Sequence, residues 1–317
     1  MGQLQRWSGE KVEVAAGCVL SIGVFEAMHL GHQALLRVVV ERARELGLVA
    51  AAITFHPAPE CVLTGQETQY VLLPEERAEI MWALGIELVV LFEFGRTAAS
   101  MPYVEFLERL AFAMHPVEIW AGPDFAIGKD REGTRETAGP AARRFGMRLE
   151  VLQPTVVDGR IVSSSLVKAL LRSGHVRQAA KLLGRLFSVR GNVVAGAGRG
   201  RKLGFPTANV AVPAAKLLPA DGVYCVQVRH RGQLYLGVAN VGVAPTFGGK
   251  ERRLEVHLLD WDGDLYGAPL EVSFVDWLRA ERHFETAQEL ARQLELDVAA
   301  ARTMCAAQVA EVNLAGL

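Results

Sequence analysis

The first half of the chain alternates between two patterns of hydrophobic residues. Short apolar runs are typical of buried strands, and longer stretches with an apolar residue at every third or fourth position are typical of helices that pack on one face. The runs that predict strands are residues 17–25, 48–55, 86–94, 117–125 and 149–157, and those that predict helices are residues 32–47, 73–85 and 102–114. This alternation indicates an α/β fold with a parallel sheet and helices on both faces, in which ligands bind at the carboxyl ends of the strands.

The pattern changes near Leu186. Before it, residues 163–184 predict two short helices separated at Gly174. After it, short alternating runs with glycine-containing turns predict an antiparallel, barrel-like domain, and residues 285–312 predict a long closing helix. We therefore expect two domains, residues 1–185 and residues 186–317.

Composition and charge narrow the possible partners. The chain has 317 residues, of which 50% are hydrophobic and 22% charged, so we expect a sizeable folded core. A net charge of −1 provides no basic field for nucleic acid. No apolar run approaches the roughly 18–20 residues that a membrane span needs, and the four cysteines lie far apart without a zinc-binding spacing. We expect a cytoplasmic protein that acts on small molecules.

Two histidines stand at the start of the first predicted helix. The stretch SIGVFEAMHLGHQALL, from Ser21 to Leu36, places His29 and His32 three residues apart and therefore on one helical face. A metal site would need a third ligand nearby, which the motif lacks. The pair is then either incidental to a helix start or a phosphate site, because helix N-termini attract anions and imidazoles there can stabilise phosphate charge.

A glycine-rich segment, GAGRGRKLGFPTAN, marks the second half. Its glycines allow backbone N–H groups to approach a phosphate chain, and its cations balance the charge. The alternative is a hairpin loop with solvated charges. The hydroxyl of Thr207 and the amide oxygen of Asn209 are hard donors of the kind that Mg²⁺ prefers, which favours the phosphate interpretation.

These stretches resemble the motifs of the bacterial bifunctional riboflavin kinase/FAD synthetases. GVFEAMHLGHQALL is similar to the family's G-x-F-D-G-x-H-x-G-H-x-x-L-L, and three further first-half segments match in order: TFHPAP, GPDFAIGKDREG and VSSSLVKALLRSG. The second half matches the riboflavin kinase module in GRGRKLGFPTANV, LPADGVYCV, GVANVGVAPTF, LEVHLLDWDGDLYG and LRAERHFETAQELARQLELDVAAAR. The resemblance covers nearly the whole chain.

The resemblance implies a Rossmann-like nucleotidyltransferase domain followed by a β-barrel riboflavin kinase domain. It implies phosphorylation of riboflavin to FMN and adenylylation of FMN to FAD, with ATP and Mg²⁺. The implied catalytic residues are Glu255 as the kinase base, His29 and His32. The implied ATP and phosphate contacts are Gly23, Phe25, Gly31, Ser163, Ser164, Lys168, Gly196, Gly200, Arg201, Lys202 and Gly204. The implied flavin contacts are Asp124, Ile127, Arg279 and Phe284, and the implied Mg²⁺ ligands are Thr207 and Asn209.

The departures from the family pattern lie in the first half. Glu26-Ala27 replaces Asp-Gly, Ala58 replaces a histidine, and Lys168 replaces an arginine that could grip phosphate with two hydrogen bonds. Two alternatives therefore stand beside the bifunctional enzyme. One is a riboflavin kinase with a weakened or inactive first half, and the other is a flavin-binding regulator without turnover.

Overall fold

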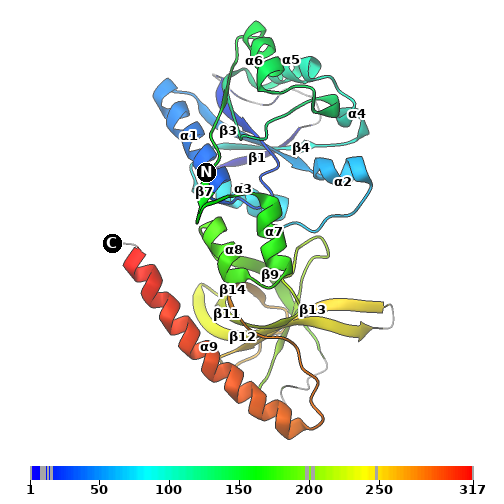
Figure 1. Cartoon of the computed structure of the whole chain (residues 1–317), viewed down its shortest axis with the longest axis vertical. Coiled ribbons are helices and arrows are strands. Elements are labelled where there is room, and N and C mark those ends of the chain that lie inside the picture. The colour runs from blue at the N-terminus through cyan, green and yellow to red at the C-terminus, as the bar shows by residue number, and fades with distance from the viewer. Residues whose placement is uncertain are drawn as a thin grey trace. The chain divides into compact units, whose positions relative to one another are not determined.

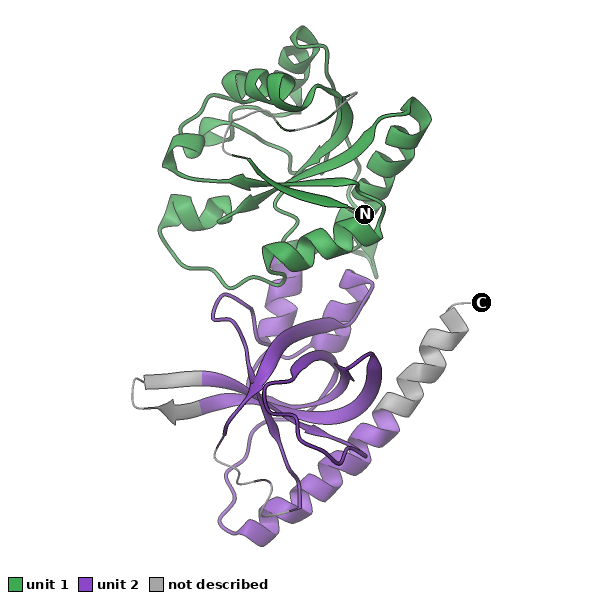
Figure 2. Ribbon diagram, turned by 180° about the vertical axis from the view of Figure 1, so that it is seen from behind, with its two compact units in different colours: residues 1–164 green, residues 165–317 purple. Residues whose placement is uncertain are grey.

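A computed structural model describes residues 2–7, 12, 14, 17–196, 200, 204–246 and 249–315. Within these ranges, only the backbone is described at 244–251 and beyond 304. The chain divides into two compact units, residues 1–164 and residues 165–317 (Figure 2). Each unit is described by itself below.

The first unit is built on a six-stranded parallel sheet with helices on both faces (Figure 1). The strand order is β1-β4-β3-β2-β5-β6. The strands are β1 (Gln3–Trp7), β2 (Cys18–Ile22), β3 (Val49–His56), β4 (Leu88–Glu93), β5 (Pro116–Ala121) and β6 (Arg148–Val151). The helices are α1 (Leu30–Leu46), α2 (Pro59–Thr64), α3 (Pro74–Ala83), α4 (Arg96–Ala99), α5 (Tyr103–Met114) and α6 (Arg135–Arg144). The predicted α/β architecture is confirmed.

The two faces of this sheet have different neighbours, because side chains alternate along each strand. Ile22, Ile53 and Phe92 point to the face covered by α5 and α6, where they join the main hydrophobic cluster. Thr54 points to the opposite face, where it contacts Arg77 of α3, and α1 also packs against β2 and β3. The carboxyl ends of β2 and β3 therefore lie next to the start of α1.

The second unit contains a closed antiparallel barrel with the strand order β10-β13-β12-β11-β14-β9. The strands are β9 (Phe187–Val194), β10 (Ala208–Ala211), β11 (Gly222–His230), β12 (Gln233–Thr246), β13 (Gly249–Leu258) and β14 (Pro269–Arg279). The last helix, α9 (Ala287–Ala315), packs on β11, β12 and β14. The predicted barrel and closing helix are confirmed. Of the helices that the structure describes, none combines the length and the apolar character needed to cross a membrane.

The predicted helix pair before the barrel is also present, as α7 (Ser164–Arg172) and α8 (Val176–Leu183). It packs on the barrel: α8 contacts β14 and β9, and the Ala220 amide donates to the carbonyl of Leu171 at the end of α7. The second compact unit accordingly begins at Ser165, whereas the sequence places the domain boundary near residue 185. The boundary at residue 185 stays a prediction.

The strand β1 and the helices α2, α4 and α6 were not expected from the sequence. The strand β1 pairs in parallel with β4, although most of its residues are polar and exposed. The run predicted as one strand, residues 149–157, is divided between β6 and β7 (Val156–Val157), which pairs with β8 (Arg160–Ile161) in a short hairpin. The helices α2 and α4 are single turns or little more, and α6 contains Pro140. None of these has an apolar run long enough to predict it.

Candidate active sites

The turn after β2 is held against the end of β3. The Gly23 amide donates to the carbonyl of Ile53 (3.1 Å), and the Thr54 hydroxyl donates to the carbonyl of Val24 (2.8 Å). Phe25 follows in a left-handed conformation with φ of 51°, so that its ring folds back over Gly23. A Cβ at Gly23 would lie 3.0 Å from that ring, which explains a glycine at this position.

His29 and His32 come together at the N-terminus of α1. His29 is the N-cap, and its Nδ1 accepts a hydrogen bond from the His32 amide (3.2 Å). The two rings stack with centroids 3.7 Å apart, and Phe25 contacts His32 edge-on. Because Nδ1 of His29 accepts, the proton of the neutral ring lies on Nε2. The pair is therefore positioned by the helix start, and His29 is buried.

The described residues contain no group of three or more histidine, cysteine, aspartate or glutamate side chains that could hold a metal ion. For this part of the chain, the metal interpretation of the histidine pair lacks the further ligands it needs. Free N–H groups and the helix dipole at the same place favour an anion instead.

Arg77 of α3 holds this turn in place through hydrogen bonds. Arg77 was not predicted as a site residue from the sequence. Its side chain is fully buried, and Nη1 donates to the carbonyls of Val24 and Phe55 (both 3.2 Å) and to the Thr54 hydroxyl (3.3 Å). Burial lowers the pKa of Arg77, and the nearby carboxylate of Glu26 is the largest opposing influence. The available signal was an arginine within the apolar stripe of α3, which also contains Ala78 and Met81.

Glu26, which stands where the family has aspartate, is also buried. Its Oε1 accepts from the Val71 amide at 3.4 Å. Glu26 and Arg77 are thus both buried near the histidine turn, and the Glu26 carboxylate opposes the lowering of the Arg77 pKa. The longer glutamate side chain has a local structural role here.

Asp124 and Ile127 lie on the loop after β5. Ile127 exchanges both backbone hydrogen bonds with Gly133 and packs in the same hydrophobic cluster as Trp7 and Phe106. Asp124 is exposed, and its backbone carbonyl accepts from Nη2 of Arg131 (2.9 Å). The loop therefore presents an exposed carboxylate beside an apolar surface.

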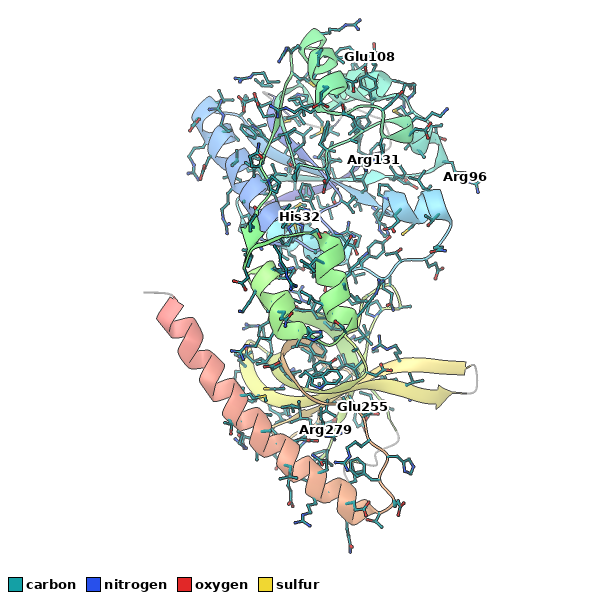
Figure 3. All side chains as sticks on the ribbon, in the orientation of Figure 1. His32, Arg96, Glu108, Arg131, Glu255 and Arg279 are labelled. Carbon is teal, nitrogen blue, oxygen red and sulfur yellow. The ribbon has the colours of Figure 1, made fainter. Side chains whose placement is uncertain are left out.

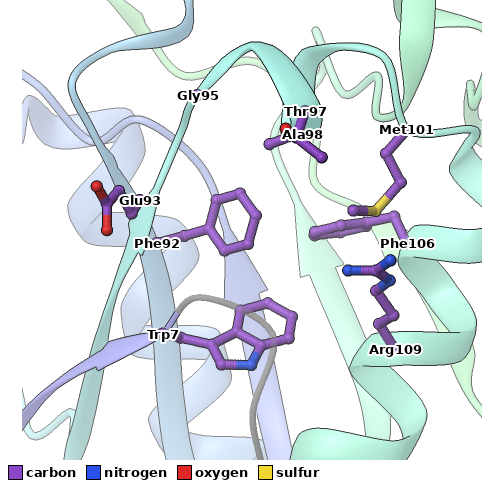
Figure 4. A pocket seen from close by; sticks show the side chains of 9 residues that line it. All are labelled: Trp7, Phe92, Glu93, Gly95, Thr97, Ala98, Met101, Phe106 and Arg109. Carbon is purple, nitrogen blue, oxygen red and sulfur yellow. The ribbon is translucent and has the colours of Figure 1, made fainter.

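A pocket of about 220 Å³ lies next to this cluster, between the end of β4 and the helices α4 and α5 (Figure 4). It is lined by Trp7, Phe92, Glu93, Gly95, Thr97, Ala98, Met101, Phe106 and Arg109. Three of its rings pack on one another, with centroids 5.1 to 6.3 Å apart. Sites that enclose drug-sized ligands usually measure about 300–1,000 Å³, so this pocket has room for part of a flavin ring system only.

The serine-rich motif begins α7. Ser163 precedes the helix, and Ser164 and Lys168 lie one turn apart on the same helical face. Ser163 and Ser164 end the first compact unit, and Lys168 belongs to the second. The spacing is compatible with joint contact to a phosphate group.

In the barrel, Glu255 faces two asparagines across neighbouring strands. Asn209 of β10 and Asn240 of β12 each pair with Glu255 of β13 in the strand register. The residues on either side, Leu254 and Val256, are buried, so Glu255 points to the other face of the strand (Figure 3). Asn240 was missed in the sequence, and its amide donates to Glu281 (3.0 Å).

Two described glycines of the glycine-rich segment, Gly196 and Gly200, lie next to Asn209 and Thr207. A Cβ at Gly196 would collide with the Asn209 amide, whereas one at Gly200 would collide with the Phe205 carbonyl oxygen and lie 3.4 Å from the Thr207 hydroxyl. Gly204 adopts a left-handed conformation with φ of 83°. Arg201 and Lys202 lie outside the described residues. The described glycines thus approach both of the expected Mg²⁺ ligands.

His257 supports the same loop. Its Nδ1 donates to the carbonyl of Pro206 (2.8 Å), and its ring packs edge-on against Phe205. Thr207 follows directly and is exposed. The histidine therefore fixes the backbone from which Thr207 projects.

Arg279 and Phe284 are also brought together, with the guanidinium 5.8 Å from the ring centre. Arg279 binds Asp297 of α9 through Nε (2.9 Å) and Nη2 (2.7 Å), and its Nη1 donates to the Ala280 carbonyl. Its donors are therefore engaged in holding α9 on the barrel. Any flavin contact would use the face of the guanidinium or the Phe284 ring.

Two family models match the chain, each on one half. The FAD synthetase model matches residues 11–166, and the riboflavin kinase model matches residues 183–305. The chain belongs to the bifunctional riboflavin kinase/FMN adenylyltransferase family. Proteins described by that name are 38% identical in Pseudomonas fluorescens, over 92% of this chain and 94% of the relative, and 35% identical in Escherichia coli K12, over 90% and 92%.

A solved structure from Streptococcus pneumoniae has the same fold along the chain. It is titled a macrolide-efflux protein, shares 31% identity, and superposes with a TM-score of 0.87 over 94% of this chain and 98% of its own. Membership of the family therefore rests on sequence matches across both halves, and the fold has a counterpart in a crystal structure.

Proposed function

We propose that this family member phosphorylates riboflavin to FMN with ATP and adenylylates FMN to FAD with release of pyrophosphate. The observation that carries the proposal is that each half matches its own family model and assembles its own polar site: the histidine pair at α1, and Glu255 opposite Asn209 in the barrel. ATP, riboflavin, FMN and FAD are then substrates or products.

In the kinase reaction, Glu255 accepts the proton of the riboflavin hydroxyl as its oxygen attacks the γ-phosphorus of ATP. The bond from that phosphorus to the bridging oxygen breaks, and ADP leaves. Gly196, Gly200 and Gly204, with Arg201 and Lys202, bind the phosphate chain. The cross-strand register of Asn209 and Glu255 supports a common reaction centre.

Thr207 and Asn209 provide the oxygens that would hold Mg²⁺. A hydroxyl and an amide oxygen fit the ion, and the glycine approach to both side chains leaves space that a Cβ would fill. When bound, the ion neutralises phosphate charge. Thr207 and Asn209 also orient the phosphates toward Glu255 by their fixed positions before and within β10.

In adenylyl transfer, a phosphate oxygen of FMN attacks the α-phosphorus of ATP, and the α–β bridging bond breaks to release pyrophosphate. The Nε2–H of His29, together with His32, donates to phosphate oxygens on which charge develops. The backbone at Gly23, Phe25 and Gly31 shapes the turn. Ser163, Ser164 and Lys168 provide further phosphate contacts.

Flavin binding is assigned to two places. In the first unit, Asp124 and Ile127 contact FMN, with part of its ring system entering the aromatic pocket. In the second unit, Phe284 and the face of Arg279 close over riboflavin. We place the protein in the cytoplasm, where ATP and riboflavin are available, without a nucleic-acid or membrane partner.

One incubation distinguishes this function from its alternatives. The purified full chain is mixed with riboflavin, ATP and Mg²⁺, and the flavins are separated by chromatography. We expect both FMN and FAD. FMN alone would favour a kinase with an inactive first half, as Ala58 and Lys168 would allow, and neither product would favour a flavin-binding regulator.

A further inference from the structure

A third histidine stands at the end of β3, next to the histidine pair. His56 is the last residue of β3, whose neighbour β2 runs parallel to it, with Ile53 opposite Ile22. Parallel strands end at the same edge of a sheet, and neighbouring strands lie about 4.8 Å apart. The turn that leads from β2 to His29 is therefore adjacent to the end of β3.

His56 also points to the face on which α1 begins. Side chains two residues apart share a face of a strand, so His56 lies on the side of Thr54. Thr54 points toward Arg77 of α3 and donates to the Val24 carbonyl in the histidine turn. His56, His29 and His32 thus share one edge and one face of the sheet.

The His56 ring has an unused polar atom. Its Nδ1 is buried and has no hydrogen-bond partner among the described residues, and the residue as a whole is only partly buried, so Nε2 is the nitrogen left to meet a ligand. Leaving a buried polar atom unpaired costs about 1–3 kcal/mol, so such atoms usually have a partner or a function. The ring rests against Tyr70, with centroids 5.8 Å apart, and gains no hydrogen bond from it in the structure.

The surroundings keep this imidazole neutral and fixed. Burial lowers the pKa of His56, and the positive charge of Arg77 lowers it further. Arg77 also donates to the Phe55 carbonyl, and the Tyr70 hydroxyl accepts from the Ala58 amide. The backbone on both sides of His56 is therefore held, while a neutral ring retains one N–H donor.

We propose that His56 is a third imidazole of the adenylyl-transfer site and donates a hydrogen bond to an ATP phosphate oxygen. It supplies an imidazole two residues before Ala58, the position at which the family motif carries its histidine. This inference rests on the proposed FAD synthesis. It makes the loss of the histidine at residue 58 compatible with a working first half.

The test compares two substitutions of similar size in the full-length enzyme. His56→Leu fills the space beside Tyr70 without a donor, and His56→Gln keeps an amide N–H. We expect His56→Leu to lower kcat/KM for ATP in FAD formation from FMN by about ten- to a hundredfold, the loss of roughly one charge-assisted hydrogen bond. His56→Gln should retain several times more activity than His56→Leu, and FMN formation from riboflavin should be unchanged in both.

A role confined to packing predicts the opposite order, because leucine removes the unpartnered nitrogen and should stabilise the unit. His115→Asn is the matched control, since His115 is exposed at the end of α5 and should leave both reactions unchanged. Wild-type FAD formation by His56→Leu, or more activity in His56→Leu than in His56→Gln, would overturn the role of His56. Absence of FAD from the wild-type reaction would overturn the proposed function and this inference together.

Discussion

Two glycines of the glycine-rich segment pack too closely on their neighbours to carry a side chain. A Cβ at Gly196 would collide with the Asn209 amide, and one at Gly200 would collide with the Phe205 carbonyl oxygen. Neither glycine has a left-handed conformation, so close approach alone requires them. Gly196 thereby packs directly on Asn209, which pairs with Glu255 in the strand register.

Gly196→Ala tests this requirement. The added Cβ would displace the Asn209 amide, so we expect FMN formation to fall at least about tenfold, which corresponds to about 1.4 kcal/mol in the barrier. FAD formation from supplied FMN should not change. The control is Gly139→Ala in α6, where the Cβ would meet open space and both rates should remain at the wild-type level. Unchanged kinase activity in Gly196→Ala would contradict the close-approach argument.

At the scale of secondary-structure elements, ion pairs connect helices to sheets in both units. In the first unit, Glu118 of β5 accepts from Arg42 of α1 through both oxygens and from the Trp120 indole. In the second unit, Asp297 and Arg279 connect α9 to β14. Each pair joins elements that are distant in sequence, and each has a different experimental signature.

The Glu118 pair predicts a pH effect on stability. Hydrogen bonds from Arg42 hold the pKa of Glu118 below its ordinary value, so the unfolded chain binds the proton more readily. The stabilisation is present above the unfolded pKa of about 4.3 and is lost as the pH falls through the lower folded pKa. Between about pH 6 and 3, the free energy of unfolding of the first unit should therefore fall less in Glu118→Gln than in the wild type. Urea unfolding across this pH range measures it.

The control for this experiment is Glu105→Gln. Glu105 pairs with Arg109 on the exposed side of α5, where both side chains are more than 40% accessible. Exposed pairs contribute little, so this variant should keep the wild-type pH profile. If the free energy of unfolding falls equally at low pH in the wild type and in Glu118→Gln, the buried pair does not control the loss of stability in acid.

The Asp297 pair predicts a loss of stability in the barrel. Asp297→Ala leaves Arg279 without its two-point partner, and we expect the free energy of unfolding of the second unit to fall by about 1.5–3 kcal/mol. Asp260→Ala removes the exposed pair with Arg302 of the same helix and should have a much smaller effect. Denaturant unfolding followed by circular dichroism measures both, and equal losses would contradict the role of burial.

The elements themselves were largely predictable, because their periodicity is local. The buried strand β2, the amphipathic α1 and the outward position of Glu255 all follow from spacing in the sequence. Arg77 and the polar strand β1 did not, because their places depend on partners more than ten residues away. The aromatic pocket joins residues 7, 92 and 106, and no local pattern could bring these together.

At the scale of the whole molecule, each unit completes a hydrophobic core of its own. The main cluster of the first unit includes Leu20, Phe92 and Leu110, and the barrel has a separate cluster that includes Val223 and Val275. The helices α7 and α8 pack on the barrel and complete the second compact unit. Independent folding of the two halves is therefore expected.

Two truncated chains test where the second folding unit begins. Residues 165–317 and residues 186–317 should both fold and form FMN. The longer one should melt at a higher temperature, because α8 buries Val176, Ala179, Leu182 and Leu183 in packing on the barrel. Calorimetry with a riboflavin kinase assay measures both properties. Identical melting temperatures would place the boundary near residue 185, and an unfolded 186–317 would show that the helix pair is essential.

Because the two units have separate cores, unfolding one unit should affect FMN and FAD production differently from unfolding the other. A mutation that unfolds the first unit should stop FAD production and leave FMN accumulating from riboflavin, because the barrel has a hydrophobic cluster of its own. A mutation that unfolds the barrel would deprive the intact first unit of its substrate, so both products would disappear unless FMN came from outside. Equal damage to the two halves would therefore have unequal metabolic consequences, and a cell supplied only with riboflavin would tolerate less damage in the second half of the chain.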